Sequence, residues 1–194
     1  MSFGFTLASF LNSTGATIST TSSHAVFDAD GRVTTFTNAG TMSNSANGDP
    51  TVVFQDGFDT FRNLAGGSIS NTLDSAVVAR GTKSGTFSNA GTISGNRWEV
   101  VNFEKGITSF VNEAGGRIVN TNDGTEPGGS AVGFQTDTGT GGIVDSFANY
   151  GELIGGTGAA GDQGPTVGFH SDSSGNAPAT NVASRSAPSS MREA

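Results

Sequence analysis

The sequence predicts an all-β fold, a right-handed parallel β-helix (β-solenoid) of about six coils with three short strands in each coil. Two recurring phrases and the composition lead to this prediction. The chain of 194 residues contains 30 Gly and is rich in Ser, Thr and Asn, among which Phe, Val and Ile return regularly. Such a composition is typical of short strands joined by turns. Gly, Ser, Thr or Asn interrupts almost every window in which apolar residues could recur at helical spacing.

The first phrase is a Phe, any residue and an Asn, followed by a Gly and then by an aliphatic residue or Met. Its six copies begin 26, 25, 26, 23 and 37 residues apart. Each copy supplies two short β-prone pieces, one around the Phe and one around the aliphatic residue. The copies are Phe10–Asn12 with Gly15 and Ile18, Phe36–Asn38 with Gly40 and Met42, Phe61–Asn63 with Gly66 and Ile69, Phe87–Asn89 with Gly91 and Ile93, Phe110–Asn112 with Gly115 and Ile118, and Phe147–Asn149 with Gly151 and Leu153.

The second phrase is a Val, usually after a small residue and often followed by Phe, and it supplies the third β-prone piece of each unit. A unit of about 23 to 26 residues excludes a propeller blade, which is longer, and Leu is too rare here for leucine-rich repeats. Three strands per unit therefore favour coils stacked about 4.8 Å apart. The copies are Ala25–Phe27, Thr51–Phe54, Ala76–Ala79, Glu99–Val101, Ala131–Phe134 and Thr166–Phe169.

In this geometry the repeated residues lie on top of one another. We expect the repeated Phe side chains to form an inward column, and the Asn two residues later to form a ladder of amide hydrogen bonds along the rod. Asn also tolerates the left-handed backbone that a sharp corner requires, so we expect these Asn residues at the corners. The column is Phe36, Phe61, Phe87, Phe110 and Phe147, and the ladder is Asn38, Asn63, Asn89, Asn112 and Asn149.

The pattern divides the chain into a β-helix domain over residues 1–170 and a tail or linker over residues 171–194, which we expect to be disordered. Two insertions, Asn120–Ser130 and Gly155–Pro165, separate an aliphatic phrase from the next Val phrase, and Thr136–Gly142 is a further loop. We expect the two insertions on one side of the solenoid, where they would carry a binding surface. Neither end shows a polar cap, so we expect the chain to be a piece of a longer protein.

The repeats resemble the passenger regions of bacterial autotransporters, the type V secretion proteins. The segments that carry this resemblance are Phe36–Gly40, Phe87–Gly95 and Phe110–Asn112, and it covers roughly residues 6 to 170. The resemblance implies display outside the cell or on the bacterial cell surface, attached to the outer membrane in the full-length protein. It also implies adhesion to a host surface or glycan, or self-association, and continuity with further passenger and a translocator barrel.

Charge and composition exclude several functions. The net charge is −8, the isoelectric point is near 4.5 and nine Lys and Arg residues are scattered along the chain, which argues against nucleic acid as a partner. Cysteine is absent, so the chain has no disulfide, thiol nucleophile or thiolate metal site. No apolar stretch reaches the length of a membrane-spanning helix.

We predict no catalytic residue, no cofactor and no metal site, and therefore no enzyme. Asp56, Asp59 and Asp74 are dispersed, and we expect Arg62, Arg80 and Arg117 to point outward as solvated charges. The two histidines, His24 and His170, are far apart, and His170-Ser171-Asp172 are sequence neighbours, which rarely form a catalytic triad. Trp98 is expected to be an unusual outward or loop aromatic rather than a ligand platform, although a lone exposed Trp could stack on a sugar.

The first functional hypothesis is a non-enzymatic surface or secreted segment, a stalk or adhesin that presents loops for adhesion or self-association. The alternative is a carbohydrate-active β-helix, either a polysaccharide lyase or hydrolase or a tailspike-like glycan binder. That alternative needs acids clustered with Arg or Lys on one sheet face, which the repeat register does not predict. A third reading, an ice- or mineral-binding solenoid, needs a regular outward Thr array, and we expect outward Thr to be irregular.

Overall fold

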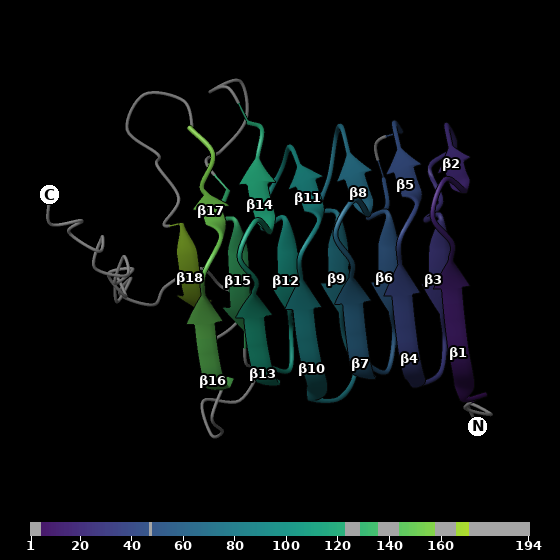
Figure 1. Cartoon of the computed structure of the whole chain (residues 1–194), viewed down its shortest axis with the longest axis horizontal. Helices are drawn as coiled ribbons and strands as arrows, with labels where there is room; N and C mark the ends of the chain where they lie inside the picture. The colour runs from purple at the N-terminus through teal and green to yellow at the C-terminus, as the bar shows by residue number, and fades with distance from the viewer. Residues whose placement is uncertain (1–4, 47, 123–128, 136–143, 158–165, 171–194) are drawn as a thin grey trace, which may run out of the picture.

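The computed structural model describes residues 5–46, 48–122, 129–135, 144–157 and 166–170. Within these residues the chain forms eighteen strands and no helix, arranged as three parallel six-stranded sheets (Figure 1). Successive strands belong to successive sheets, so the chain passes once through each sheet in every coil. This confirms the predicted parallel β-solenoid with three strands per coil.

Each sheet collects one of the repeated phrases. Sheet A holds the Phe-x-Asn phrases as β1 (Leu7–Asn12), β4 (Val33–Asn38), β7 (Phe58–Asn63), β10 (Ser84–Asn89), β13 (Ile107–Asn112) and β16 (Val144–Asn149). Sheet B holds the aliphatic phrases as β2 (Thr17–Thr20), β5 (Thr41–Asn44), β8 (Ser68–Asn71), β11 (Thr92–Gly95), β14 (Arg117–Asn120) and β17 (Glu152–Ile154). Sheet C holds the Val phrases as β3 (Phe27–Ala29), β6 (Val52–Phe54), β9 (Val77–Ala79), β12 (Val101–Phe103), β15 (Val132–Gln135) and β18 (Val167–His170).

The Phe side chains of sheet A form the predicted inward column. Phe87 pairs in register with Phe61 on one side and Phe110 on the other. Its ring stacks on theirs at centroid distances of 4.6 and 5.1 Å, within 8° of parallel. Phe36 and Phe147 continue the stack, and Phe10 adds a sixth ring at the N-terminal end. The column exists because equivalent residues of parallel strands lie about one strand spacing apart.

A second group of rings from sheet C packs edge-on against this column. Phe103 stacks on Phe134 and meets Phe110 at 83°. Ala79 stands between Phe54 and Phe103 in the register and interrupts this second stack. Phe58 of sheet A contacts both Phe54 and Phe103, at 4.9 and 6.3 Å, and so fills the space beside the small residue.

Sheet A also buries a position that the repeated phrases do not mark. Val33, Phe58 and Ile107 lie three residues before the column Phe and are fully buried. A flat strand would place residues three apart on opposite faces, so these strands bend between the two inward positions. In β10 this position is Ser84, whose buried Oγ makes no hydrogen bond among the described residues.

The Asn ladder is present, but the left-handed backbone expected of these Asn residues is wrong. Each side-chain amide donates to the next, from Asn12 to Asn38, Asn63, Asn89, Asn112 and Asn149, over 2.8 to 2.9 Å. Among the described residues, however, the only non-Gly residue with positive φ is Trp98, at 53°. Gly15, Gly66 and Gly115 take the left-handed positions that follow the Asn residues, because Gly has no Cβ to clash there. The Asn side chains are needed for their hydrogen bonds.

The described residues do not include the tail over residues 171–194, the loop Thr136–Gly142 or most of the two insertions. The disorder of the tail and the binding role of the insertions therefore stay predictions. No helix in the described part of the chain is long and apolar enough to cross a membrane.

Candidate functional site

Sheet C differs from the other two sheets because other parts of the chain cover its outer face. The outward residues Val53, Val78 and Asn102 are only 2%, 4% and 8% exposed. Outward residues of sheet A, such as Asp59 and Arg62, are exposed. The cover leaves a groove of about 340 Å³ over β9 and β12, which is close to the lower end of the volumes of small-molecule sites.

The groove gathers polar side chains around one aromatic ring. Val78 and Asn102 come from the strands of its floor, Arg80 and Glu104 directly follow those strands, and corner segments of three coils supply the rest. Its lining is Gly48, Asp49, Pro50, Asp74, Ser75, Val78, Arg80, Trp98, Glu99, Asn102 and Glu104.

The corner residues of the groove are equivalent positions of successive coils. Asp49, Asp74 and Trp98 each lie three residues before a Val of sheet C, and those Val residues, Val52, Val77 and Val101, pair in register. The next coil, the fifth of the solenoid, has Gly129 at this position, before Val132. A side chain there would collide with the Trp98 carbonyl, because a Cβ on Gly129 would lie 1.8 Å from that oxygen. The glycine therefore lets the next coil pack against the backbone of Trp98.

Trp98 is held in a conformation that a bulky residue seldom adopts. Its φ is 53°, a backbone region that costs about 1–3 kcal/mol for a residue with a large side chain. The Asn120 side-chain amide donates to the Trp98 carbonyl over 2.8 Å and fixes the backbone from the next coil. Residue Trp98 is nevertheless 53% exposed, and the Arg97 guanidinium lies over its ring, 5.4 Å from the ring centre. The fold thus holds a flat aromatic surface open to solvent beside the groove.

Some polar side chains of the groove already contact other residues of the chain. Arg80 Nε lies 3.1 Å from Glu104 Oε1, with both side chains about a third exposed. Glu99 lies against Gly133, since a Cβ on Gly133 would be 2.2 Å from Glu99 Cγ. The Asn102 amide oxygen is buried and makes no hydrogen bond among the described residues. An unsatisfied buried oxygen costs about 1–3 kcal/mol.

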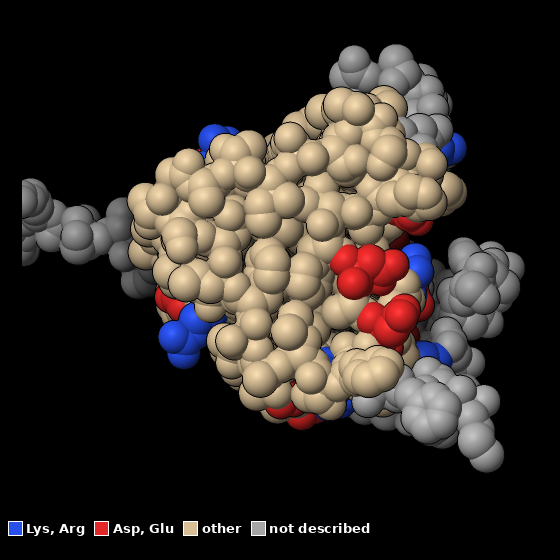
Figure 2. All heavy atoms as spheres, turned by 90° about the vertical axis from the view of Figure 1, so that its right-hand side faces the viewer, with Lys and Arg blue, Asp and Glu red and all other residues tan. Residues whose placement is uncertain are grey.

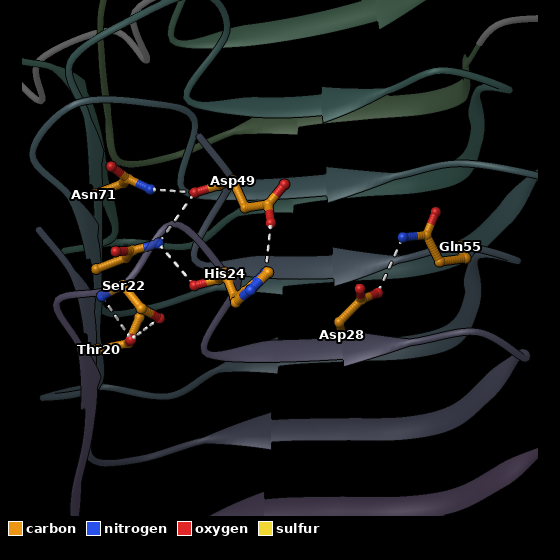
Figure 3. Close-up of polar contacts among 8 residues, drawn as sticks. Thr20, Ser22, His24, Asp28, Asp49, Gln55 and Asn71 are labelled. Carbon is orange, nitrogen blue, oxygen red and sulfur yellow. Dashed lines mark hydrogen bonds and ion pairs between the residues drawn. The ribbon is translucent and has the colours of Figure 1, made fainter. Parts of the chain in front are cut away.

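Figure 3 shows the contacts of Asp49, one of the residues that line the groove. The Asp49 carbonyl accepts hydrogen bonds from the Asn44 and Asn71 side chains, over 3.1 and 3.0 Å. The Asp49 carboxylate lies 3.8 Å from Nδ1 of His24, whose side chain is 86% exposed. Such an exposed pair contributes little stability. His24 is therefore a surface neighbour of the groove.

The other residues considered in the sequence do not form a site. Asp59 pairs with Arg32, Arg117 pairs with Glu152, and Arg62 points outward. The His170 side chain and residues 171 and 172 lie outside the described part. Among the described residues no three His, Asp or Glu side chains are placed to hold a metal ion.

The repeat register predicts no cluster of acids with Arg or Lys on a sheet face. Asp74, Glu99, Glu104 and Arg80 nevertheless line one groove, and all four lie just outside the strands of sheet C. The strand pattern does not mark such positions.

Outward Thr on sheet B is irregular, as expected, whereas outward hydroxyl groups are regular. On sheet B they stand in two rows in register over four coils, with Ser in place of some Thr. Thr itself is irregular, but the hydroxyl group is continuous. The rows are Thr17, Thr41, Ser68, Thr92 and Ser19, Ser43, Ser70, Ser94.

No known protein family, curated protein or solved structure matches this chain.

Proposed function

We propose that this chain is a non-enzymatic, surface-displayed or secreted β-solenoid segment that binds a glycan in the groove on sheet C. The observation that carries the proposal is Trp98, whose exposed ring is held over a polar groove by a strained backbone. Backbone strain of this kind persists where the surrounding structure enforces it, and it is concentrated at ligand sites.

The groove has the chemistry that recognises a sugar ring. An indole offers a flat apolar surface, which suits the C–H face of a pyranose. Carboxylates accept hydrogen bonds from sugar hydroxyls, and the Arg80 guanidinium donates them. Because several hydroxyls are bound at once, each polar group contributes to specificity.

The charge of the groove selects among glycans. Asp49, Asp74, Glu99 and Glu104 carry four negative charges against the single positive charge of Arg80, a formal net charge of −3. This disfavours acidic polysaccharides, because their carboxylates would meet like charges in a partly desolvated site. We therefore propose neutral or amino sugars as the ligand class.

The resemblance to autotransporter passengers supports the cellular setting of this proposal. A single groove of this size gives weak binding, and many copies on one surface would raise the overall strength of adhesion. The proposed setting is therefore the bacterial cell surface or the extracellular space, with a host surface or glycan as partner.

Intrinsic fluorescence tests the proposal directly, because Trp98 is the only tryptophan in the chain. We expect neutral or amino-sugar oligosaccharides to change its emission in a saturable way, and oligouronates to leave it unchanged. Calorimetry then compares the wild type with Trp98→Ala, which should lose binding, and with Tyr150→Ala, an exposed aromatic outside the groove, which should retain it. Binding that survives Trp98→Ala would refute the proposal.

The acids in the groove favour one second candidate, a glycoside hydrolase, because such enzymes use two carboxylates. Incubating the bound oligosaccharide with the protein and measuring new reducing ends separates the two functions. We expect none to form, and catalytic release of reducing ends would replace binding by hydrolysis.

A further inference from the structure

The corner between β5 and β6 contains the one Asp–Pro bond of the sequence, between Asp49 and Pro50. The carboxyl group of an Asp can reach the carbonyl carbon of its own main chain, because the attack closes a five-membered ring. The nitrogen of Pro50 belongs to a tertiary amide, which takes up a proton more readily than an ordinary peptide nitrogen and then leaves as an amine. The two residue types together make this peptide bond the one most open to cleavage by its own side chain.

The fold places two hydrogen-bond donors on the carbonyl oxygen of this bond. The side-chain amides of Asn44 and Asn71 donate to the Asp49 carbonyl over 3.1 and 3.0 Å, and both residues are buried (Figure 3). When a nucleophile attacks a carbonyl carbon, negative charge develops on the oxygen, and donors already fixed there stabilise it. The two amides therefore form an oxyanion hole for attack on the Asp49 carbonyl.

Backbone contacts fix the orientation of both amides. Oδ1 of Asn44 accepts from the Ala46 N–H over 2.9 Å. Oδ1 of Asn71 accepts from the two N–H groups of Leu73–Asp74, over 2.9 and 2.8 Å. Turning either amide over would place its NH₂ group against these donors, so the nitrogens face the Asp49 carbonyl. The donors are thus in place before any reaction.

The same corner of another coil lacks the second donor. Among the residues that the structure describes, the Trp98 carbonyl accepts from one side-chain amide, that of Asn120 in the next coil. Gly95 stands where its own coil would supply the other amide, since it pairs in register with Asn120. The Asp–Pro corner has an Asn in both coils, Asn44 and Asn71, which also pair in register. The double donor thus coincides with the Asp–Pro bond.

The Asp49 carboxyl group can turn toward its own carbonyl carbon. It lies 3.8 Å from His24 Nδ1, and both side chains are exposed, so this contact holds it only weakly. The exposure also gives water access to the corner. The other charged side chains that line the groove with Asp49 are Asp74, Arg80, Glu99 and Glu104.

We propose that the folded chain cleaves itself at the Asp49–Pro50 bond. One oxygen of the protonated Asp49 carboxyl group forms a bond to the Asp49 carbonyl carbon, the bond from this carbon to the Pro50 nitrogen breaks, and the carboxyl proton passes to that nitrogen. Water then opens the resulting cyclic anhydride to two carboxyl groups. The net reaction is hydrolysis of one peptide bond, once in each chain. It turns over no added substrate and does not depend on glycan binding.

The two pieces are expected to stay together after the cut. Strands β4 and β5 of the N-terminal piece pair with β7 and β8 of the other piece, and Phe36 stacks on Phe61 across the boundary at 5.0 Å. Figure 2 views the molecule from the first coil, where most of the visible surface carries no charged side chain. Because strand pairing and apolar packing hold the N-terminal piece, acid does not release it, and the cut becomes visible only after denaturation.

The experiment follows the full chain by mass spectrometry after denaturation. The protein is incubated in mildly acidic buffer, in which circular dichroism shows that it is folded. We expect two pieces, residues 1–49 and residues 50–194, and a cut at least about tenfold faster than in the same chain incubated in denaturant at the same pH. The Glu126–Pro127 bond is an internal control, since attack by Glu126 would need a six-membered ring.

Four variants, each checked for folding by circular dichroism, test the chemistry and the donors. Asp49→Glu retains the carboxyl group but enlarges the ring, and Pro50→Ala retains the ring but replaces the tertiary amide, so each should slow the cut at least about tenfold. Asn71→Ala removes one donor and should slow it about 100-fold or more. Asn120→Ala removes the equivalent amide from a corner without an Asp–Pro bond and should leave the rate unchanged.

Three results would overturn the proposal. The first is a folded wild type that is cut no faster than the denatured chain. The second is a wild-type rate of cleavage in Asp49→Glu, and the third is a wild-type rate in folded Asn71→Ala. The first two remain decisive even where Asn71→Ala does not fold.

Discussion

The direction of the Asn ladder predicts that one substitution, Asn to Asp, has a large effect at one position and a small effect at another. Asn89 accepts from Asn63 and donates to Asn112 Oδ1 and to the Arg117 carbonyl, over 2.8 and 3.3 Å. An ionised Asp accepts only, so Asn89→Asp places a buried carboxylate against two acceptors. Asn149 accepts from Asn112 and donates to no described residue, so Asp in its place retains the one interaction.

The expected magnitudes follow from the lost partners. Asn89→Asp removes the donor from two acceptors, Asn112 Oδ1 and the Arg117 carbonyl, each at a cost of about 1–3 kcal/mol, so we expect a loss of about 2–6 kcal/mol at neutral pH. For Asn149→Asp, at a partly buried position that loses no described hydrogen bond, we expect a loss of less than about 1 kcal/mol. A loss of the larger size is a substantial fraction of the stability of an ordinary domain, about 5–15 kcal/mol.

The loss at Asn89→Asp should also depend on pH. Burial against acceptors raises the pKa of the new carboxyl above its value in the unfolded chain, so the folded state binds the proton more tightly. Stability relative to the wild type must then fall as pH rises through and above the ordinary range of Asp, and recover in acid, where the protonated carboxyl donates again.

Urea unfolding at several pH values, followed by circular dichroism at dilutions where the protein is monomeric, measures both effects. Equal losses for the two variants would refute the directional ladder, and so would a loss at Asn89→Asp that does not change with pH.

Four other substitutions test the core and the groove. Phe87→Ala removes a fully buried ring stacked between two others and should lower the free energy of unfolding in urea by about 3–5 kcal/mol. Phe10→Ala removes a ring with a stacked neighbour on one side only and should lower it by less. A change near zero at Phe87 would contradict its place in the core. Ser84→Ala removes a buried hydroxyl without a described partner, so the free energy of unfolding should stay the same or rise by up to about 1 kcal/mol. A loss of more than about 1 kcal/mol would show that the hydroxyl makes a hydrogen bond. Trp98→Asn introduces a residue that tolerates positive φ, and it should abolish the glycan binding measured by calorimetry. The free energy of unfolding should stay the same or rise by about 1 kcal/mol. A large destabilisation would mean that the Trp98 ring is needed for the fold.

The sequence by itself determined the solenoid, the inward Phe column and the Asn ladder. These features repeat, and in a stack of parallel strands a repeat in the sequence becomes a column in space. The repeat alone therefore assigns residues as far apart as Phe36 and Phe147 to one column, and their rings do lie in one stack. The physical reason is that strand alternation and strand spacing fix where each repeated side chain lies.

Only the tertiary structure decided what happens where the chain leaves the strands. The bend in sheet A that buries Val33 together with Phe36 depends on how the coil closes, and strand alternation alone predicts the opposite face. The residues with left-handed backbone are Gly residues and Trp98, because the corner geometry of each coil requires positive φ at their positions. The groove likewise joins Asp49, Asp74 and Trp98 from three coils. Counting three residues back from the paired Val residues would have brought these side chains together, but their chemistry differs from coil to coil, so no pattern in the sequence marks them. Stacking places equivalent corner residues side by side whatever their type, and the side chains that collect there then determine what the groove can bind.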